Sequence, residues 1–383
     1  MTKWLINGLI WALLLLLIGC VSRTYRVPDR PEKAEPEPVT ILVVIGKSIE
    51  EINLQSDNAV LLNAGKSTKL PTRSVIEVND GYIIVNGKHY TTPVYFQSPN
   101  KMRINGKEYF GSILVQDRFI INILPVEEYL KGVLSSEVAE NWPVEALKAQ
   151  AVVSRTFAYR KILNKKDTLY DVDDTTMYQK FDYSEINSRI NSAILDTNGI
   201  IILYQNEPIE AFFHSNSGGV TENCRDIFQK DLPYLRSIPD PYSSKNQDTF
   251  WTFSMTGKEI KAALKGIIMQ EYESLVLRDI RIYKKTGSRR AGEFLLIFER
   301  NQRQVIKGNT FRLAVDPKSL KSLLIHNIHR ARAKGGYTFT FSGRGYGHGV
   351  GLSQFGAKRM AEQGFSYRDI IAYYFRGTRL GNY

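Results

Sequence analysis

The stretch YLKGVLSSEVAENWPVEALKAQAVVSRTFAYR, from Tyr129 to Arg160, decides how the centre of this chain folds. Apolar residues recur at helical spacing on both sides of the Asn-Trp-Pro sequence that ends at Pro143, which predicts two successive helices. Pro143 suits the first turn of the second helix, because its missing N–H is not needed there. The first helix then ends near Glu137, whose carboxyl is expected where the two helices meet.

Glu137 is the main candidate for chemistry in this stretch. We expect burial beside a tryptophan to raise the pKa of Glu137. A carboxyl that stays protonated near neutral pH can act as a general acid. Four neighbouring acids are instead expected on the solvated surface. One of them, Glu145, lies in the first turn of the second helix, where the helix dipole favours an acid. These four are Glu127, Glu128, Glu140 and Glu145.

Three blocks of sequence, in order, resemble one known family. They are GVLSSEVAENWPVEALKAQAVVSRTFAYR (132–160), FFHSNSGGVTEN (212–223) with PYLRSIPDPY (233–242), and GRGYGHGVGLSQFGAKRMAEQGFSYRDIIAYYF (343–375). The blocks are similar to those of the SpoIID/LytB family, the stage II sporulation D proteins and amidase enhancers that act on bacterial peptidoglycan. Three ordered blocks are far more specific than one short motif. The resemblance covers roughly residue 106 to the end, and it implies that Glu137 is the catalytic glutamate.

The N-terminus, MTKWLINGLIWALLLLLIGC, predicts export. One Lys precedes an apolar run of the secretory-signal type, and the run ends in Leu-Ile-Gly-Cys, which resembles a bacterial lipobox. We expect residues 1–19 to be a lipoprotein signal peptide and Cys20 to become the acylated first residue. A plain transmembrane anchor is the alternative, since the run is long for a signal core and short for a full span. The expected location is extracytoplasmic, periplasmic or on the outer face of the cell membrane, with the lipid in the membrane.

Composition and charge limit the class of partner. The chain has 383 residues, 43% of them hydrophobic, and a formal net charge of +12. A basic protein outside the cytoplasm meets anionic lipid headgroups and peptidoglycan, whose muramic acid carries a carboxylate. Expected export, and basic residues spread along the chain rather than concentrated in one arm, argue against nucleic acid as a partner.

The order of the segments predicts an α+β chain. Residues 20–38 are charged and proline-rich, as in a disordered tether. Residues 39–105 favour β structure, with Asn-Gly hairpin signals at 86–87 and 105–106. Residues 106–383 mix helical and strand patterns and form the expected SpoIID/LytB-like domain.

The second and third blocks supply candidate residues for a glycan cleft. A Ser-His triad is disfavoured, because no G-x-S-x-G turn occurs. Paired glycines in the second block suggest a tight turn that lets the backbone approach a sugar. The glycine-rich third block either binds sugar or only lets the C-terminal helix dock, and both interpretations stay open. The expected substrate-binding residues are His214, Ser217, Tyr234, Tyr346, His348 and Gln354.

No metal or cofactor is predicted. Some members of the family that this chain resembles bind zinc through Cys and His, but Asp173 and Tyr178 stand where some relatives carry cysteines. There is no C-x-x-C or H-E-x-x-H sequence. A zinc site would instead require His214, Cys224 and His348 to converge in space.

A single acid and a glycan substrate favour one reaction. Ordinary glycosidases need two carboxylates. A lytic transglycosylase can use one, which protonates the oxygen between N-acetylmuramic acid and N-acetylglucosamine and then deprotonates the muramic C6 hydroxyl, leaving a 1,6-anhydro end. The resemblance implies a preference for strands stripped of stem peptides by an amidase. Two alternatives remain: a non-catalytic enhancer of an N-acetylmuramoyl-L-alanine amidase, and a hydrolase that uses Asp226, Asp231 or Asp240 as a second carboxylate.

Overall fold

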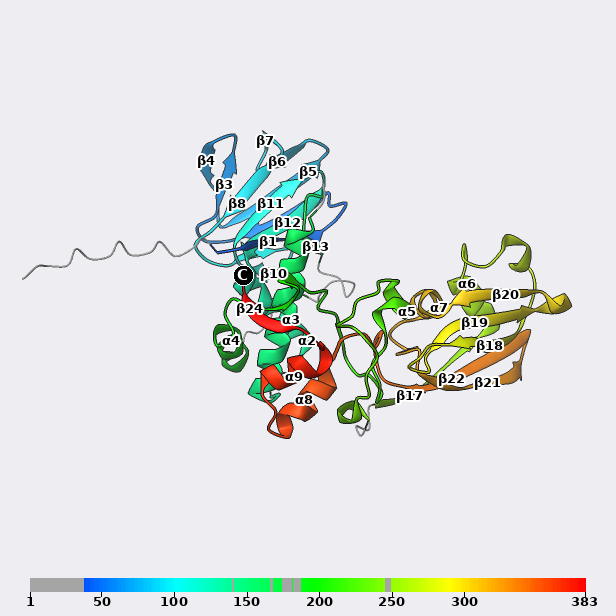
Figure 1. Ribbon diagram of the computed structural model, residues 1–383. Coiled ribbons are helices and arrows are strands. Elements are labelled where there is room, and N and C mark those ends of the chain that lie inside the picture. The colour runs from blue at the N-terminus through cyan, green and yellow to red at the C-terminus, as the bar shows by residue number, and fades with distance from the viewer. Residues whose placement is uncertain (1–37, 140, 166–167, 174–180, 182–186, 245–248) are drawn as a thin grey trace, which may run out of the picture. The chain divides into compact units, whose positions relative to one another are not determined.

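The computed structural model describes residues 38–139, 141–165, 168–173, 181, 187–244 and 249–383 (Figure 1). The expected signal peptide, Cys20, almost all of the tether, Glu140 and Tyr178 lie outside the described residues. No helix in the described part of the chain is long and apolar enough to cross a membrane. Val39 to Tyr383 form one compact unit, and its mixture of helices and strands confirms the expected α+β class.

The N-terminal region consists of two sheets whose strands alternate buried and exposed residues. The Asn-Gly hairpins are confirmed, because Asn86, Gly87, Asn105 and Gly106 all have positive φ between paired strands. The strands are β1 (Thr40–Gly46), β2 (Glu51–Gln55), β3 (Val60–Asn63), β4 (Lys66–Lys69), β5 (Arg73–Asn79), β6 (Tyr82–Val85), β7 (Lys88–Thr91), β8 (Val94–Gln97), β9 (Met102–Ile104), β10 (Lys107–Tyr109), β11 (Ser112–Gln116) and β12 (Phe119–Pro125).

The two sheets continue past residue 105. One has the order β13-β1-β12-β11-β8-β3-β4 and the other β10-β9-β2-β5-β6-β7, so strands after residue 105 pair with strands before it. We therefore propose that the β-rich region extends to Pro125, where the first helix begins.

The predicted helix pair is confirmed. Helix α2 (Val126–Glu137) and helix α3 (Val144–Leu163) flank a short connection, and Pro143 occupies the N-cap position one residue before α3. Helix α3 is the central helix of this region, because it packs against α2, α4, α8, α9 and β14. The other elements are β13 (Val172–Asp173), α4 (Ser188–Leu195), β14 (Ile200–Tyr204), β15 (Glu207–Pro208), β16 (Phe213–His214), α5 (Cys224–Phe228), η1 (Pro241–Ser243), β23 (Leu352–Ser353), α8 (Gln354–Glu362), α9 (Tyr367–Tyr374) and β24 (Arg379–Asn382).

Residues 250–344 form a module with a hydrophobic core of its own, which runs from Trp251 to Phe341. Two three-stranded sheets, β18-β19-β20 and β17-β22-β21, enclose this core (Figure 1). The elements are β17 (Phe250–Thr256), α6 (Gly257–Ala263), η3 (Gln270–Tyr272), β18 (Leu277–Lys285), β19 (Ala291–Phe298), η4 (Glu299–Asn301), β20 (Arg303–Lys307), α7 (Gly308–Val315), β21 (Ile325–Ala333) and β22 (Gly336–Arg344). The module separates the second sequence block from the third.

Candidate active site

Glu137 is the last residue of helix α2, and its side chain is half-buried. Leu130, Val133 and Leu134 bury the opposite part of the helix in the core, and the chain leaves the helix in an extended conformation at Val138. Tyr129 lies two turns earlier, and burial raises the pKa of its hydroxyl, with the charge of Glu137 as the next cause. The carboxyl therefore lies at the end of α2 within electrostatic reach of a buried phenol.

Trp142, in the turn after Glu137, packs against helix α8. Its ring is buried and meets Phe355 edge-on, with 5.5 Å between the ring centroids. The ammonium of Lys358 lies 5.6 Å from the same ring, and Arg189 donates a hydrogen bond of 3.0 Å to the Trp142 carbonyl. These contacts fix the start of α3 against the third sequence block.

Gln354, in the third sequence block, contacts Glu137 through its side chain. Its amide Nε2 donates to Glu137 Oε2 at 3.4 Å, a long hydrogen bond across 217 positions of sequence. The Ser353 hydroxyl caps α8 by accepting from the Gly356 amide, so Gln354 is the first residue of that helix. The amide is nearly buried, which restricts its rotamers and aims its donor at the carboxylate.

A buried network around Asp240 joins the second and third blocks. The hydroxyls of Ser217 and Ser243 donate to Asp240 Oδ2 at 2.7 and 2.6 Å, and Tyr374 donates to Oδ1 at 3.1 Å. Ser243 also contacts the Ser353 hydroxyl at 2.7 Å. All these groups are buried, and the carboxylate has three hydroxyl donors. The network holds Ser353 in place, and through it the start of α8 and Gln354.

The other two acids considered as a second carboxylate have surface partners of their own. Asp231 is exposed and forms an ion pair with Arg236. Asp226 is exposed in the first turn of α5, where it accepts from Asn223 at 3.4 Å.

His214 and His348 both hydrogen-bond to the backbone of Val350. Their ring centroids are 5.6 Å apart, His214 Nδ1 donates to the Val350 carbonyl at 3.1 Å, and His348 Nδ1 accepts from the Val350 amide at 3.0 Å. These partners require the proton on Nδ1 of His214 and on Nε2 of His348. The pair therefore fixes the glycine-rich loop, and β16 pairs His214 with Ser353.

Both histidines are neutral in the folded protein. Burial lowers the pKa of His214 well below its usual value, with His348 and Arg290 as further causes. Burial lowers the pKa of His348 to about 3, with Arg312 and Arg290 adding to the effect. Neither ring is therefore a source of positive charge at neutral pH.

Acid should weaken the fold through this pair. A histidine pKa that is lower in the folded state contributes stability above about pH 6.5 that is lost as pH falls toward 3, because the unfolded chain then binds the extra proton. Each ring should cost about 1.4 kcal/mol per pH unit well below pH 6. Urea unfolding measured between pH 7 and 4.5 gives the free energy of unfolding at each pH. This free energy should fall less steeply with decreasing pH for His348→Gln than for the control His329→Gln, whose ring is exposed. Equal slopes would contradict this account.

Sequence analysis missed Arg290, a fully buried guanidinium beside this pair. Arg290 donates to the Ser217 carbonyl at 2.7 Å and to Ser288 at 3.0 Å. Glu222, also fully buried, accepts from Ser288 at 2.7 Å and from Thr286 at 2.5 Å. Burial lowers the pKa of Arg290 to about 10, while the nearby Glu222 opposes this shift. These contacts anchor the 250–344 module to the second block, and no spacing in the sequence signals them.

Tyr234 lies beside Glu210, and Cys224 begins helix α5, whose Phe228 ring lies 5.2 Å from the ring of His348. The Tyr234 hydroxyl accepts from the Glu210 amide at 3.2 Å, and Arg160 influences its pKa. Arg160 is 16 residues beyond the start of α3, or roughly 24 Å along the helix. Burial raises the pKa of Cys224 to about 11, so its thiol stays protonated. Tyr234 is therefore remote from Glu137.

The zinc alternative requires His214, Cys224 and His348 to come together around one ion. Among the described residues, no group of three or more His, Cys, Asp or Glu side chains is arranged to hold a metal ion.

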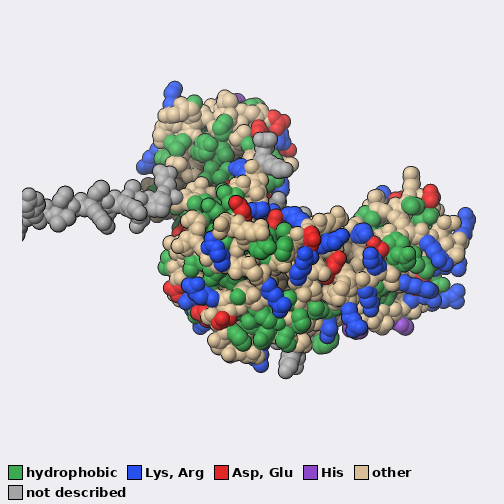
Figure 2. Space-filling view, in the orientation of Figure 1, with side chains coloured by type: hydrophobic (Ala, Val, Ile, Leu, Met, Phe, Trp, Pro, Cys, Tyr) green, Lys and Arg blue, Asp and Glu red, His purple; other side chains and the backbone are tan. Residues whose placement is uncertain are grey.

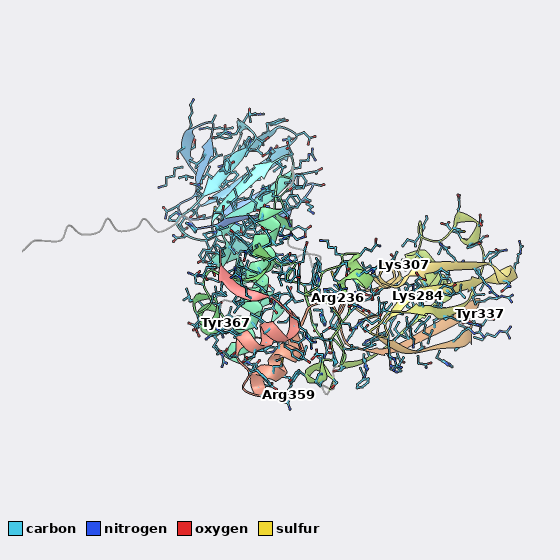
Figure 3. All side chains as sticks on the ribbon, in the orientation of Figure 1. Arg236, Lys284, Lys307, Tyr337, Arg359 and Tyr367 are labelled. Atoms are coloured by element: carbon cyan, nitrogen blue, oxygen red, sulfur yellow. The ribbon has the colours of Figure 1, made fainter. Side chains whose placement is uncertain are left out.

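Tyr346 lies at the surface next to the second block. It is 38% exposed, its backbone pairs with Asn216, and the ammonium of Lys321 lies 5.7 Å from its ring. Figure 3 shows the described side chains as sticks on the ribbon. Of the predicted substrate residues, Gln354 contacts Glu137 directly, and Ser217 and His214 support the loops around Gln354.

Comparison with known proteins agrees with the three sequence blocks. The family model for stage II sporulation protein, SpoIID, matches residues 116–204. Stage II sporulation protein D of Bacillus subtilis is 32% identical over 275 residues, which cover 67% of this chain and 74% of that protein. An uncharacterised protein of Brachyspira hyodysenteriae is 31% identical over 77% of this chain and 78% of its own length. The amidase enhancer of Bacillus subtilis is 27% identical over 76% of this chain and 46% of its own length. The chain therefore belongs to the SpoIID family.

Proposed function

We propose that this protein is a peptidoglycan lytic transglycosylase. The observation that carries the proposal is the position of Glu137, a half-buried carboxyl at a helix end that receives one amide hydrogen bond from Gln354. The other carboxylates considered in the sequence already accept hydrogen bonds or form an ion pair with other side chains. One acid that also serves as the base is what this reaction requires.

Glu137 would act twice in the reaction. As an acid it gives its proton to the glycosidic oxygen between N-acetylmuramic acid and N-acetylglucosamine, and the bond from that oxygen to C1 breaks. The muramic C6 hydroxyl then attacks C1, and the Glu137 carboxylate takes its proton, which restores the acid and leaves a 1,6-anhydro ring. Gln354 donates to Oε2 and holds the carboxyl in place during both proton transfers. The attack needs no water, and its intramolecular geometry raises its effective concentration greatly.

The proposed setting is the outer side of the cell membrane. Cys20 would carry a lipid, and the substrate would be glycan strands from which an amidase has removed the stem peptides. The similarity to a stage II sporulation protein and to an amidase enhancer supports a role beside such an amidase.

Product analysis tests the proposal. The purified protein is incubated with glycan strands with and without stem peptides, and the products are analysed by mass spectrometry. We expect 1,6-anhydromuramic ends on stripped strands. Reducing ends that incorporate solvent oxygen would instead identify a hydrolase.

The amidase enhancer relative supports a second candidate function. In that case the protein would bind the glycan or an amidase and would not cut the strand. Intact strands on both substrates, together with a faster reaction of an added N-acetylmuramoyl-L-alanine amidase, would favour this function.

A further inference from the structure

Residues 250–344 carry the net charge of the whole chain. They contain 19 Lys and Arg residues and 7 Asp and Glu residues, a balance of +12 that equals the net charge of all 383 residues. Basic residues do occur along the whole chain, but their excess over acidic residues lies in this module. Figure 2 shows blue Lys and Arg side chains gathered over the surface of β18 to β22. Lys284 and Lys307, labelled in Figure 3, flank Glu293 in the strand register. A module of this charge attracts polyanions.

Part of this module lacks acids altogether. No Asp or Glu occurs from Pro317 to Ala361, a stretch that includes β21, β22, the glycine-rich loop and most of α8. The stretch ends beyond Gln354, the residue that contacts Glu137. A carboxylate-bearing polymer would therefore meet no acidic side chain from this stretch along its path toward Glu137.

The outer face of the β17-β22-β21 sheet is lined with small polar side chains. Trp251, Phe339 and Phe341 point into the module's core, and the alternating residues point outward. The outward residues form cross-strand rows, in which Thr252, Ser342 and Asn327 lie side by side and Ser254, Thr340 and His329 form the next row. We call these six residues the hydroxyl face.

The hydroxyl face is open to solvent. Thr252, Ser254, Asn327 and His329 are exposed, and Ser254 and Thr340 share a hydrogen bond of 2.8 Å. Hydroxyl and amide groups both donate and accept hydrogen bonds, as the hydroxyls of a sugar do. A flat surface of this chemistry suits a polyhydroxylated chain laid along the strands.

An aromatic and a cationic residue stand at one end of this face. Phe250 is 62% exposed and pairs in register with Arg344, which is also exposed. An exposed ring offers an apolar surface to the apolar face of a sugar, and a guanidinium binds carboxylates. This end therefore offers both groups that a carboxylate-bearing sugar requires.

The same end connects to Glu137 through short contacts. Thr249, next to Phe250, accepts from Gly345 at 2.7 Å and from Asn216 at 3.3 Å. The carbonyl of Ser215 accepts from the Phe355 amide at 3.0 Å, and Gln354 precedes Phe355. These contacts link the Phe250 end of the hydroxyl face to Gln354, which contacts Glu137.

We propose that the hydroxyl face is a docking surface for glycan strands whose muramic acids carry free carboxylates. The proposal rests on the proposed function for the identity of the polymer. It adds that the 250–344 module holds the strand while the bond at Glu137 is cut. The hydroxyl rows bind sugar hydroxyls, Phe250 and Arg344 bind one sugar at the end nearest Glu137, and the net charge of the module attracts the carboxylates.

Binding is best measured with full-length Glu137→Gln protein in detergent. This variant is expected not to cut the strands, so they stay intact during the measurement. The assay is co-sedimentation with amidase-stripped peptidoglycan at low and moderate salt. The double variant Thr252→Asp with Asn327→Asp places two negative charges on the hydroxyl face and should weaken binding at least tenfold. The matched control is Tyr283→Asp with Val305→Asp, which adds the same charges at exposed positions of the β18-β19-β20 sheet. The control should bind within twofold of the parent protein.

Each other outcome overturns the docking surface. Equal binding by the face variant and the parent excludes the face, and equal loss in both double variants assigns binding to net charge alone. If the face variant bound stripped glycan normally but no longer bound vesicles of anionic lipid, the face would be a membrane contact. The proposed reaction is judged separately, by the anhydro products of protein that carries Glu137. Its failure would leave a binding result intact.

Discussion

Glu137→Gln should reduce the release of 1,6-anhydromuramic products by about 10³-fold or more. Glutamine can neither give a proton to the glycosidic oxygen nor take one from the C6 hydroxyl, and general acid-base catalysis alone contributes about 10² to 10⁴-fold. The amide has the same shape as the carboxyl, and Gln354 can turn its own amide to present its carbonyl oxygen instead of its Nε2 donor. Mass spectrometry of products from stripped glycan strands measures the effect.

The matched control for this experiment is Glu128→Gln on the same helix. Glu128 is half-buried and pairs with Lys131 on the surface of α2, so the substitution removes one charge without reaching Glu137. It should keep product release within about twofold. If Glu137→Gln released anhydro products as fast as the parent, the carboxyl would not be the acid, and if the parent instead left strands intact while it enhanced an added amidase, the protein would be an enhancer. The enhancer function would then replace the proposed one.

The helix pair around Pro143 and the Asn-Gly hairpins could be predicted, because helical spacing and turn residues act over a few positions. The contact of Gln354 with Glu137 could not, since it joins residues 217 positions apart. Only the resemblance indicated that these blocks belong together. Burial patterns alone would have placed Gln354 among ordinary helix residues.

Longer-range features of the site were beyond sequence reasoning. Tyr234 was a reasonable choice as part of a block, but its hydroxyl serves the Glu210 amide at the other end of α3. Arg290 gave no signal, because its buried partners, among them the Ser217 carbonyl, come from another part of the chain. The separate core of residues 250–344 was likewise invisible in strand patterns that each looked ordinary. Such features depend on which elements pack together, and local preference does not encode that.

Asp240→Ala should destabilise the protein by about 3–5 kcal/mol, because it removes the acceptor of three buried hydroxyls. Ser217, Ser243 and Tyr374 would then be left without their partner in a region from which water is excluded. A shift of several degrees in the midpoint of thermal unfolding would show the loss. The control Asp231→Ala, which removes an exposed ion pair, should change stability by less than about 1 kcal/mol.

The Asp240→Ala variant also distinguishes a transglycosylase from a hydrolase that uses Asp240 as its second carboxylate. If Asp240 only holds Ser353 and the start of α8, Asp240→Ala measured well below its unfolding temperature should keep making anhydro products, at a rate lowered by less than about a hundredfold. The reduced rate would come from a Gln354 side chain that is held less firmly. Gln354→Ala should therefore lower the rate by a larger factor in the parent protein than in protein that already carries Asp240→Ala. If Asp240 were instead a second catalytic carboxylate, folded Asp240→Ala protein would lose activity as completely as Glu137→Gln, and a hydrolase would have to replace the transglycosylase.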